Sequence, residues 1–84
     1  MWVVRVVSVT GSHGLHARPA AVFAKTAKGF RCRVTVVSDA GSADGKSIVG
    51  LMTLGIAGMS TVTIAADGDD AEQAVAALAA VVEG

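Results

Sequence analysis

The sequence contains few cysteine, proline and aromatic residues. There is one cysteine, one proline, one tryptophan, two phenylalanines and no tyrosine. Because the lone Cys32 cannot form an internal disulfide, we exclude a small secreted scaffold that is held together by disulfides. The scarcity of aromatic side chains means that the core consists mainly of small aliphatic residues, which favours close packing of helices against a sheet.

Net charge and a long hydrophobic run are also absent. Seven basic and seven acidic residues cancel, so no overall field attracts the chain to nucleic acid or to an anionic membrane. The apolar stretch at residues 2–7 is interrupted by Arg5 and is much shorter than the ~20 residues that a membrane-spanning helix needs. We therefore expect a cytoplasmic protein without nucleic-acid binding or membrane insertion, and a single domain over residues 1–84.

Alternating side chains predict four β-strands. β-branched residues indicate strands over residues 2–10, 31–38 and 61–66, and a short, weakly patterned return strand is expected within residues 42–45. In two of these segments, alternate residues are apolar, which is typical of strands with one face on the core and one face in water.

Apolar residues at helical spacing predict three helices. The first begins at Ala17 and ends at Gly29, where a left-handed glycine is expected to stop the helix and to let Phe30 fold back onto it. The second is short, is capped by the hydroxyl of Ser47 and ends near Gly55.

The third helix follows Asp69 and Glu72, whose spacing is that of a capping box, and runs to the end of the chain. The resulting order, β-α-β-β-α-β-α, leaves no crossover long enough for a doubly wound fold. We therefore predict an α+β fold with one antiparallel sheet and its helices on one face.

The start of the first helix carries the strongest functional signal, in the segment Gly14-Leu15-His16-Ala17-Arg18-Pro19-Ala20-Ala21. Proline in the first helical turn loses no hydrogen bond, so Pro19 predicts that the helix starts at or just after His16. His16 is then the N-cap residue, a position where Ser, Asp or Asn would stabilise the helix better. We infer that the imidazole is there for another purpose.

A helix N-terminus attracts anions because its first N–H groups have no partner in the helix and its dipole is positive there. The N–H groups of Ala17 and Arg18 are expected to bind a phosphoryl group, and the Arg18 guanidinium adds a cation. The same positive end should lower the pKa of His16 and keep one ring nitrogen free to act as a nucleophile. His16 is therefore the candidate phosphoryl acceptor.

With these residues, the chain resembles the HPr family of histidine-containing phosphocarrier proteins of the bacterial phosphoenolpyruvate-dependent sugar phosphotransferase system. The resemblance covers nearly the whole chain and implies an open-faced β-sandwich of four strands and three helices. Besides the His16 segment, it includes Lys25 to Phe30, Lys46-Ser47-Ile48 through Met52, Leu54-Gly55-Ile56, and the acidic turn from Ala65 to Ala71.

The resemblance also implies how the residues act. His16 would accept a phosphoryl group from enzyme I and pass it to sugar-specific enzyme IIA proteins, with Arg18 assisting. The chain would then be a monomeric carrier without a cofactor, and not an enzyme. Ser47 matches a serine that a dedicated HPr kinase phosphorylates in many members of the family, which adds this kinase and a transcriptional regulator as partners.

Exposed apolar residues near the phosphoryl site would dock these partners, although Ile48, Val49 and Met52 could also belong to the core. The candidate docking residues are Ala21, Ile48, Val49 and Met52.

Other interpretations remain open. The chain could serve a nitrogen-regulatory or dihydroxyacetone-kinase branch of the same chemistry, or it could be a purely regulatory binding module that acts through Ser47. We predict no metal site, because no acidic or thiol ligands lie near His13 and His16 in the sequence. His13 and the Gly58-Met59 pair depart from the family pattern. His13 could alter the charge near His16, and Gly58-Met59 could alter the geometry of an exposed loop.

Overall fold

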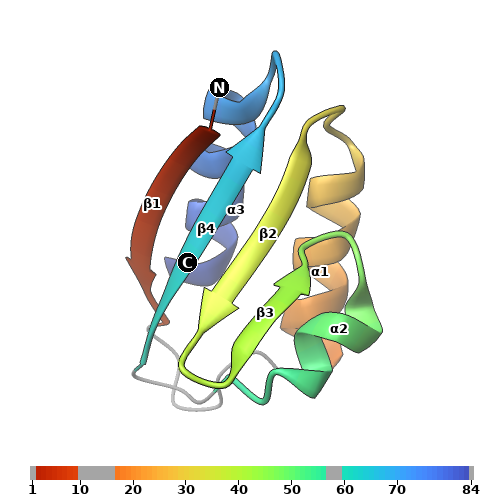
Figure 1. The fold of residues 1–84 in the computed structure, drawn as a ribbon. Helices are drawn as coiled ribbons and strands as arrows, with labels where there is room; N and C mark the ends of the chain where they lie inside the picture. Colours follow the sequence, from red (N-terminus) through yellow and green to blue (C-terminus); the bar gives the residue numbers. More distant parts are fainter. Residues whose placement is uncertain (1, 10–16, 57–59, 84) are drawn as a thin grey trace.

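The computed structural model describes residues 2–9, 17–56 and 60–83. These residues form strands and helices in the predicted βαββαβα order (Figure 1). The strands are β1 (Trp2–Ser8), β2 (Arg33–Ser38), β3 (Gly41–Asp44) and β4 (Thr61–Asp67), and the helices are α1 (Ala17–Lys28), α2 (Ile48–Thr53) and α3 (Ala71–Glu83).

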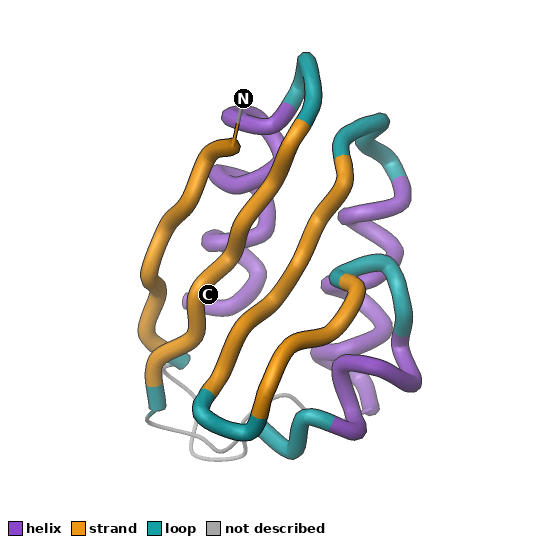
Figure 2. Tube along the Cα trace, in the orientation of Figure 1, coloured by secondary structure: helices purple, strands orange, loops and turns teal. Residues whose placement is uncertain are grey.

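The four strands form one antiparallel sheet in the order β1-β4-β2-β3. β4 is therefore a central strand, and Asp67 near its end pairs with Trp2 of β1 on one side and with Arg33 of β2 on the other. The helices α1 and α3 cover one face of the sheet, and α2 lies next to α1 beyond β3 (Figures 1 and 2). This arrangement confirms the predicted α+β fold with helices on one face.

The core lies between the sheet and the two longer helices. Val62, Ile64 and Ala66 alternate along β4 and are all buried, as the sequence pattern predicted. Phe23 of α1 and Leu78 of α3 are completely buried. Small aliphatic side chains thus fill most of the layer, with Phe23 as its large aromatic member.

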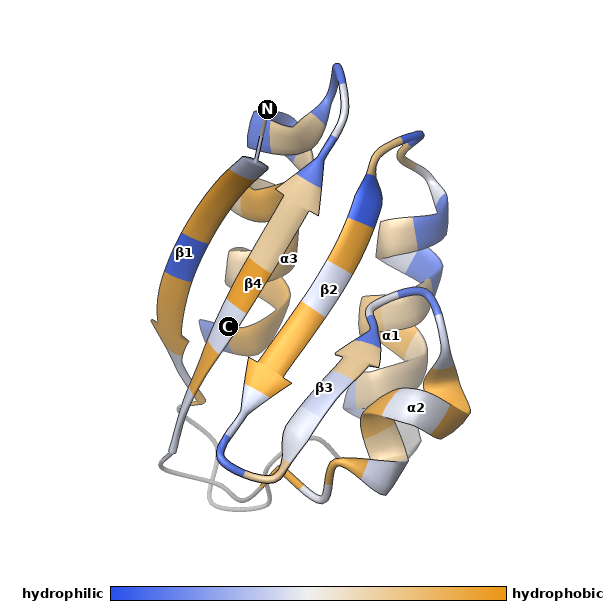
Figure 3. Ribbon diagram, viewed as in Figure 1, coloured by the Kyte–Doolittle hydropathy of each residue, from blue (hydrophilic) through white to orange (hydrophobic). Residues whose placement is uncertain are grey.

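Among the described residues, no helix covers the opposite face of the sheet. On β1, an edge strand, Trp2, Val4 and Val6 are 51%, 60% and 65% exposed, and Figure 3 shows this strand as largely hydrophobic. The helices in the described ranges are too short or too polar to cross a bilayer, and the longest of them, α3, has 13 residues.

The end of α1 differs from the prediction. Among the described glycines, those with positive φ are Gly41, Gly55 and Gly68, so Gly29 is not a left-handed stop. Instead, the N–H of Gly29 and the N–H of Phe30 each donate to the carbonyl three residues earlier, at 3.1 Å. These bonds tighten the last turn and satisfy its carbonyls without a left-handed residue. Phe30 is partly buried and packs against the core.

The predicted capping box of α3 is also wrong. The helix begins at Ala71, so Asp70 and not Asp69 precedes it. The carbonyl of Asp70 accepts the N–H of Ala74 at 3.0 Å, which is the first bond of the helix. The spacing of Asp69 and Glu72 therefore predicted the presence of the helix correctly, but it predicted the wrong N-cap residue.

Strand ends move by one or two residues from the predicted positions. β1 stops at Ser8, although the N–H of Val9 still donates to the carbonyl of Ser60 at 2.7 Å. β2 starts at Arg33, two residues later than predicted, because the carboxylate of Asp70 binds the two N–H groups before it.

Candidate functional site

The candidate site lies at the N-terminal end of α1. The structure places Ala17 and Arg18 in the first turn of this helix, followed by Pro19. His16 and the side chains of Ala17 and Arg18 lie outside the described residues, so the capping role of His16 stays a prediction. His16 nevertheless directly precedes Ala17, the first residue of α1. The N–H groups in the first turn of a helix have no hydrogen-bond partners within that helix.

The charges along α1 leave its N-terminal end free for an anion. Within Ala17–Lys28, the first turn holds no acidic side chain, and Lys25 and Lys28 lie in the last turn. The lysines favour the helix because they oppose the negative end of its dipole. An anion at the other end therefore meets no competing carboxylate from the described part of this helix.

Ser47 is the N-cap of α2, as predicted. Its backbone is extended, with φ −110° and ψ 113°, and its hydroxyl oxygen accepts the N–H of Gly50 at 3.0 Å. The neighbouring Lys46 ammonium donates to the carbonyl of Phe30 at 2.9 Å, which ties the start of α2 to the chain that leaves α1. The serine oxygen thus sits at a fixed, half-buried position.

α2 has one buried anchor and an exposed apolar surface. Leu51 is completely buried, whereas Ile48, Val49 and Met52 are 38%, 74% and 47% exposed. Ala21 on α1 is half-buried. The alternative that the three α2 residues belong to the core is therefore wrong, and their exposure leaves them free to dock a partner.

Val22 is a further exposed apolar residue, at 49%, that was not among the predicted docking residues. It falls off the buried stripe of α1, which contains Ala20, Phe23, Ala24 and Ala27. An apolar residue off such a stripe is the signal that could have found it.

The carboxylate of Asp70 is a second feature that the sequence did not reveal. It accepts the N–H of Arg31 at 2.8 Å and the N–H of Cys32 at 3.0 Å. The Arg31 N–H in particular holds the pKa of Asp70 below its ordinary value. Burial, together with Asp70, raises the pKa of the Cys32 thiol, so this cysteine stays protonated and acts as a small core residue.

Metal ligands are not grouped in this part of the chain. Within residues 2–9, 17–56 and 60–83, no three His, Cys, Asp or Glu side chains come together as a metal centre would require.

Comparison with known proteins identifies the family. The family described as PTS HPr component phosphorylation site, where PTS is the phosphotransferase system, matches residues 3–84. The phosphocarrier protein HPr of Haemophilus influenzae is 46% identical over 76 residues, covering 90% of this chain and 89% of that protein. HPr of Vibrio cholerae is 46% identical over 77 residues, covering 92% and 91%.

A solved structure agrees with these sequence relatives. The crystal structure of HPr from Bacillus anthracis matches with a TM-score of 0.93 and 41% identity, and the match covers 98% of each chain. Sequence and fold thus agree over almost the entire length. The chain belongs to the HPr family, whose members carry phosphoryl groups in the phosphotransferase system and are not catalytic enzymes.

Proposed function

We propose that His16 is the residue that accepts the phosphoryl group from phospho-enzyme I and passes it to enzyme IIA proteins. Membership of the HPr family implies these two kinds of partner. The observation that supports His16 is that α1 begins at Ala17, so the histidine is joined to the N-terminal end of a helix.

The transfer needs a nucleophile and a place for negative charge. A ring nitrogen of His16 attacks the phosphorus, and the N–P bond forms as the bond from phosphorus to the donor's leaving atom breaks. The phosphoryl oxygens are then held by the N–H groups at the start of α1 and by the Arg18 guanidinium. The second transfer reverses these steps with the acceptor's nucleophile.

The partners reach this site over exposed and half-buried apolar side chains of α1 and α2. The candidate docking residues are Ala21, Ile48, Val49 and Met52. Because this surface must be open to two successive partners, we place the exchange on a monomer. We also place this monomer in the cytoplasm. Val49 is the most exposed of them and its loss should weaken docking most.

Ser47 is the proposed regulatory site, with a kinase and a transcriptional regulator as further partners. Its hydroxyl already accepts an N–H at the start of α2, so a phosphate there can keep an acceptor in the same place. The added dianion would lie next to Ile48 and Val49 in the sequence. It would change docking by repelling a partner that binds the apolar surface or by recruiting one that binds phosphate.

The test of the carrier residue uses enzyme I and labelled phosphoenolpyruvate. The wild-type chain should gain acid-labile label, and His16→Ala should gain none, whereas the matched control His13→Ala should be labelled normally. Arg18→Ala should slow labelling while keeping it acid-labile, because the nucleophile remains. Acid-stable label, or label retained in His16→Ala, would contradict the proposal.

A further inference from the structure

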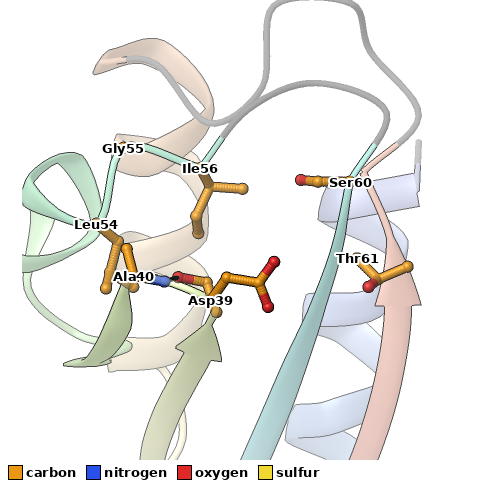
Figure 4. A pocket seen from close by; sticks show the side chains of 8 residues that line it. Asp39, Ala40, Leu54, Gly55, Ile56, Ser60 and Thr61 are labelled. Carbon is orange, nitrogen blue, oxygen red and sulfur yellow. Dashed lines mark hydrogen bonds between the residues drawn. The ribbon is translucent and has the colours of Figure 1, made fainter.

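A pocket of about 190 Å³ lies where the β2–β3 turn, the chain after α2 and the start of β4 meet (Figure 4). In Figure 1, the β2–β3 turn and the start of α1 lie at the same, lower end of the molecule. A partner that binds at the start of α1 therefore approaches the end of the molecule where this pocket lies.

The pocket combines apolar walls with one charged group. Leu54 and Ile56 are 9% and 6% exposed and form an apolar side. Ser38 and Thr61 add hydroxyl groups, and Asp39 is the one charged residue among the described residues that line the pocket. Figure 4 shows the Asp39 carboxylate directed toward the start of β4, across the space between the walls.

The turn that carries this carboxylate is held in place. The hydroxyl of Ser38 accepts the N–H of Ala40 at 3.2 Å, on either side of Asp39. This bond restrains the backbone on either side of Asp39, although the residue itself is exposed. A restrained turn loses less conformational entropy than a mobile one when its carboxylate binds a cation. Leu54 and Gly55 directly follow α2, so the C-terminal end of this helix borders the pocket.

Size limits the occupant to about one side chain. The volume of about 190 Å³ exceeds that of an apolar cavity of ~150 Å³ that binds benzene. It is smaller than the ~300–1,000 Å³ of typical small-molecule sites. A single long side chain therefore suits this volume better than a free cofactor does.

We propose that this pocket receives an arginine or lysine side chain from the protein partner that docks beside the start of α1. The apolar stem of such a side chain lies along Leu54 and Ile56, and its charged head reaches Asp39 and the hydroxyl oxygens. This inference rests on the proposed carrier function for the identity of the partner, but the pocket's preference for a cation can be measured without any phosphoryl transfer.

The first experiment titrates the full chain with propylguanidinium and follows backbone amide signals by NMR. Saturable shifts are expected at Ala40, Ile56 and Thr61, and Asp39→Asn should weaken binding by about fivefold. The matched control is Asp69→Asn, which removes an equal charge in the turn before α3 and should leave binding unchanged. Ala40→Lys places a competing cation at the exposed rim and should weaken binding as well.

The second experiment measures phosphoryl transfer between the chain and its partners. Asp39→Asn should raise the KM for the carrier by about threefold or more with at least one partner and leave kcat unchanged, because only docking is affected. Equal behaviour of Asp39→Asn and Asp69→Asn in both experiments would overturn the pocket proposal. Since the propylguanidinium titration needs no phosphoryl group, its outcome is independent of whether His16 is the carrier.

Discussion

Asp70 joins two segments that are far apart in the sequence. Its two carboxylate oxygens bind the N–H groups of Arg31 and Cys32, just before β2, while its carbonyl begins α3. One side chain thus fixes the start of a strand and the start of a helix. The same carboxylate also affects Cys32. Together with burial, it raises the pKa of the Cys32 thiol, which therefore remains protonated and unreactive.

The lowered pKa of Asp70 predicts a pH-dependent stability. Because the pKa is lower in the folded chain than in the unfolded chain, the carboxylate stabilises the fold above the ordinary carboxyl range of about 4 and loses this effect as the pH falls through the lower folded-state pKa. Urea unfolding between neutral and acidic pH should show this loss in the wild type. Asp70→Asn should be less stable at pH 7 and show a weaker pH dependence, whereas Asp69→Asn should behave like the wild type.

Gly68, in the turn before α3, occupies a position that only glycine fits without strain. Its φ is +151°, and an added Cβ would lie 2.8 Å from both Cα and Cβ of Cys32. Gly68→Ala should therefore lower the free energy of unfolding by about 1–3 kcal/mol. The control is Gly55→Ala, where φ is +60° but nothing lies within 4 Å, so that only backbone strain of about 1 kcal/mol is expected. An equal loss in both variants would contradict the close approach to Cys32.

At the scale of elements, the sequence predicted helix and strand positions better than it predicted their ends. Ser47 was predicted correctly because its hydroxyl acts on an N–H three residues away, within one local segment. Asp69 was chosen wrongly as a cap because its neighbour Asp70 has partners 38 and 39 residues away. The predicted left-handed stop at Gly29 was wrong because the N–H groups of Gly29 and Phe30 donate to carbonyls three residues earlier. These bonds end the helix without a positive φ.

The cap of α2 can be tested by substitution. Ser47→Ala removes the hydroxyl that accepts the N–H of Gly50 and should destabilise the chain by about 1 kcal/mol. Ser47→Asp keeps an acceptor at the N-cap and should be close to the wild type in denaturant unfolding. Both variants should still carry phosphoryl groups, because His16 is unchanged. Equal stability of Ser47→Ala and the wild type would contradict a stabilising cap.

At the scale of the whole molecule, an 84-residue chain buries only about 60% of its unfolded surface, so each large core residue matters. Leu78 is completely buried, and Leu78→Ala should cost about 2–5 kcal/mol, a large share of the total stability. Val49→Ala, at a side chain that is 74% exposed, should change stability by less than about 0.5 kcal/mol. Denaturant unfolding of the two variants would compare the contribution of a buried side chain to the free energy of unfolding with that of an exposed one.

Most of the fold could be predicted because strand alternation and helical spacing are properties of short segments. The buried faces of β4 and α3, including Ile64 and Leu78, follow directly from these patterns. The pocket at Asp39 could not be predicted, because its walls come from three segments that only the tertiary fold brings together: the β2–β3 turn, the chain after α2 and the start of β4. The His16 site could be proposed from the sequence, because the nucleophile and the start of the helix are adjacent along the chain.

The role of His16 is tested most directly by locating the phosphoryl group after transfer from enzyme I. The modified chain, kept at alkaline pH to preserve phosphohistidine, would be digested and its peptides fragmented by mass spectrometry. We predict that the added mass lies on the imidazole of His16. Its location on His13 or Ser47 instead would contradict the claim that the start of α1 holds the transferred group.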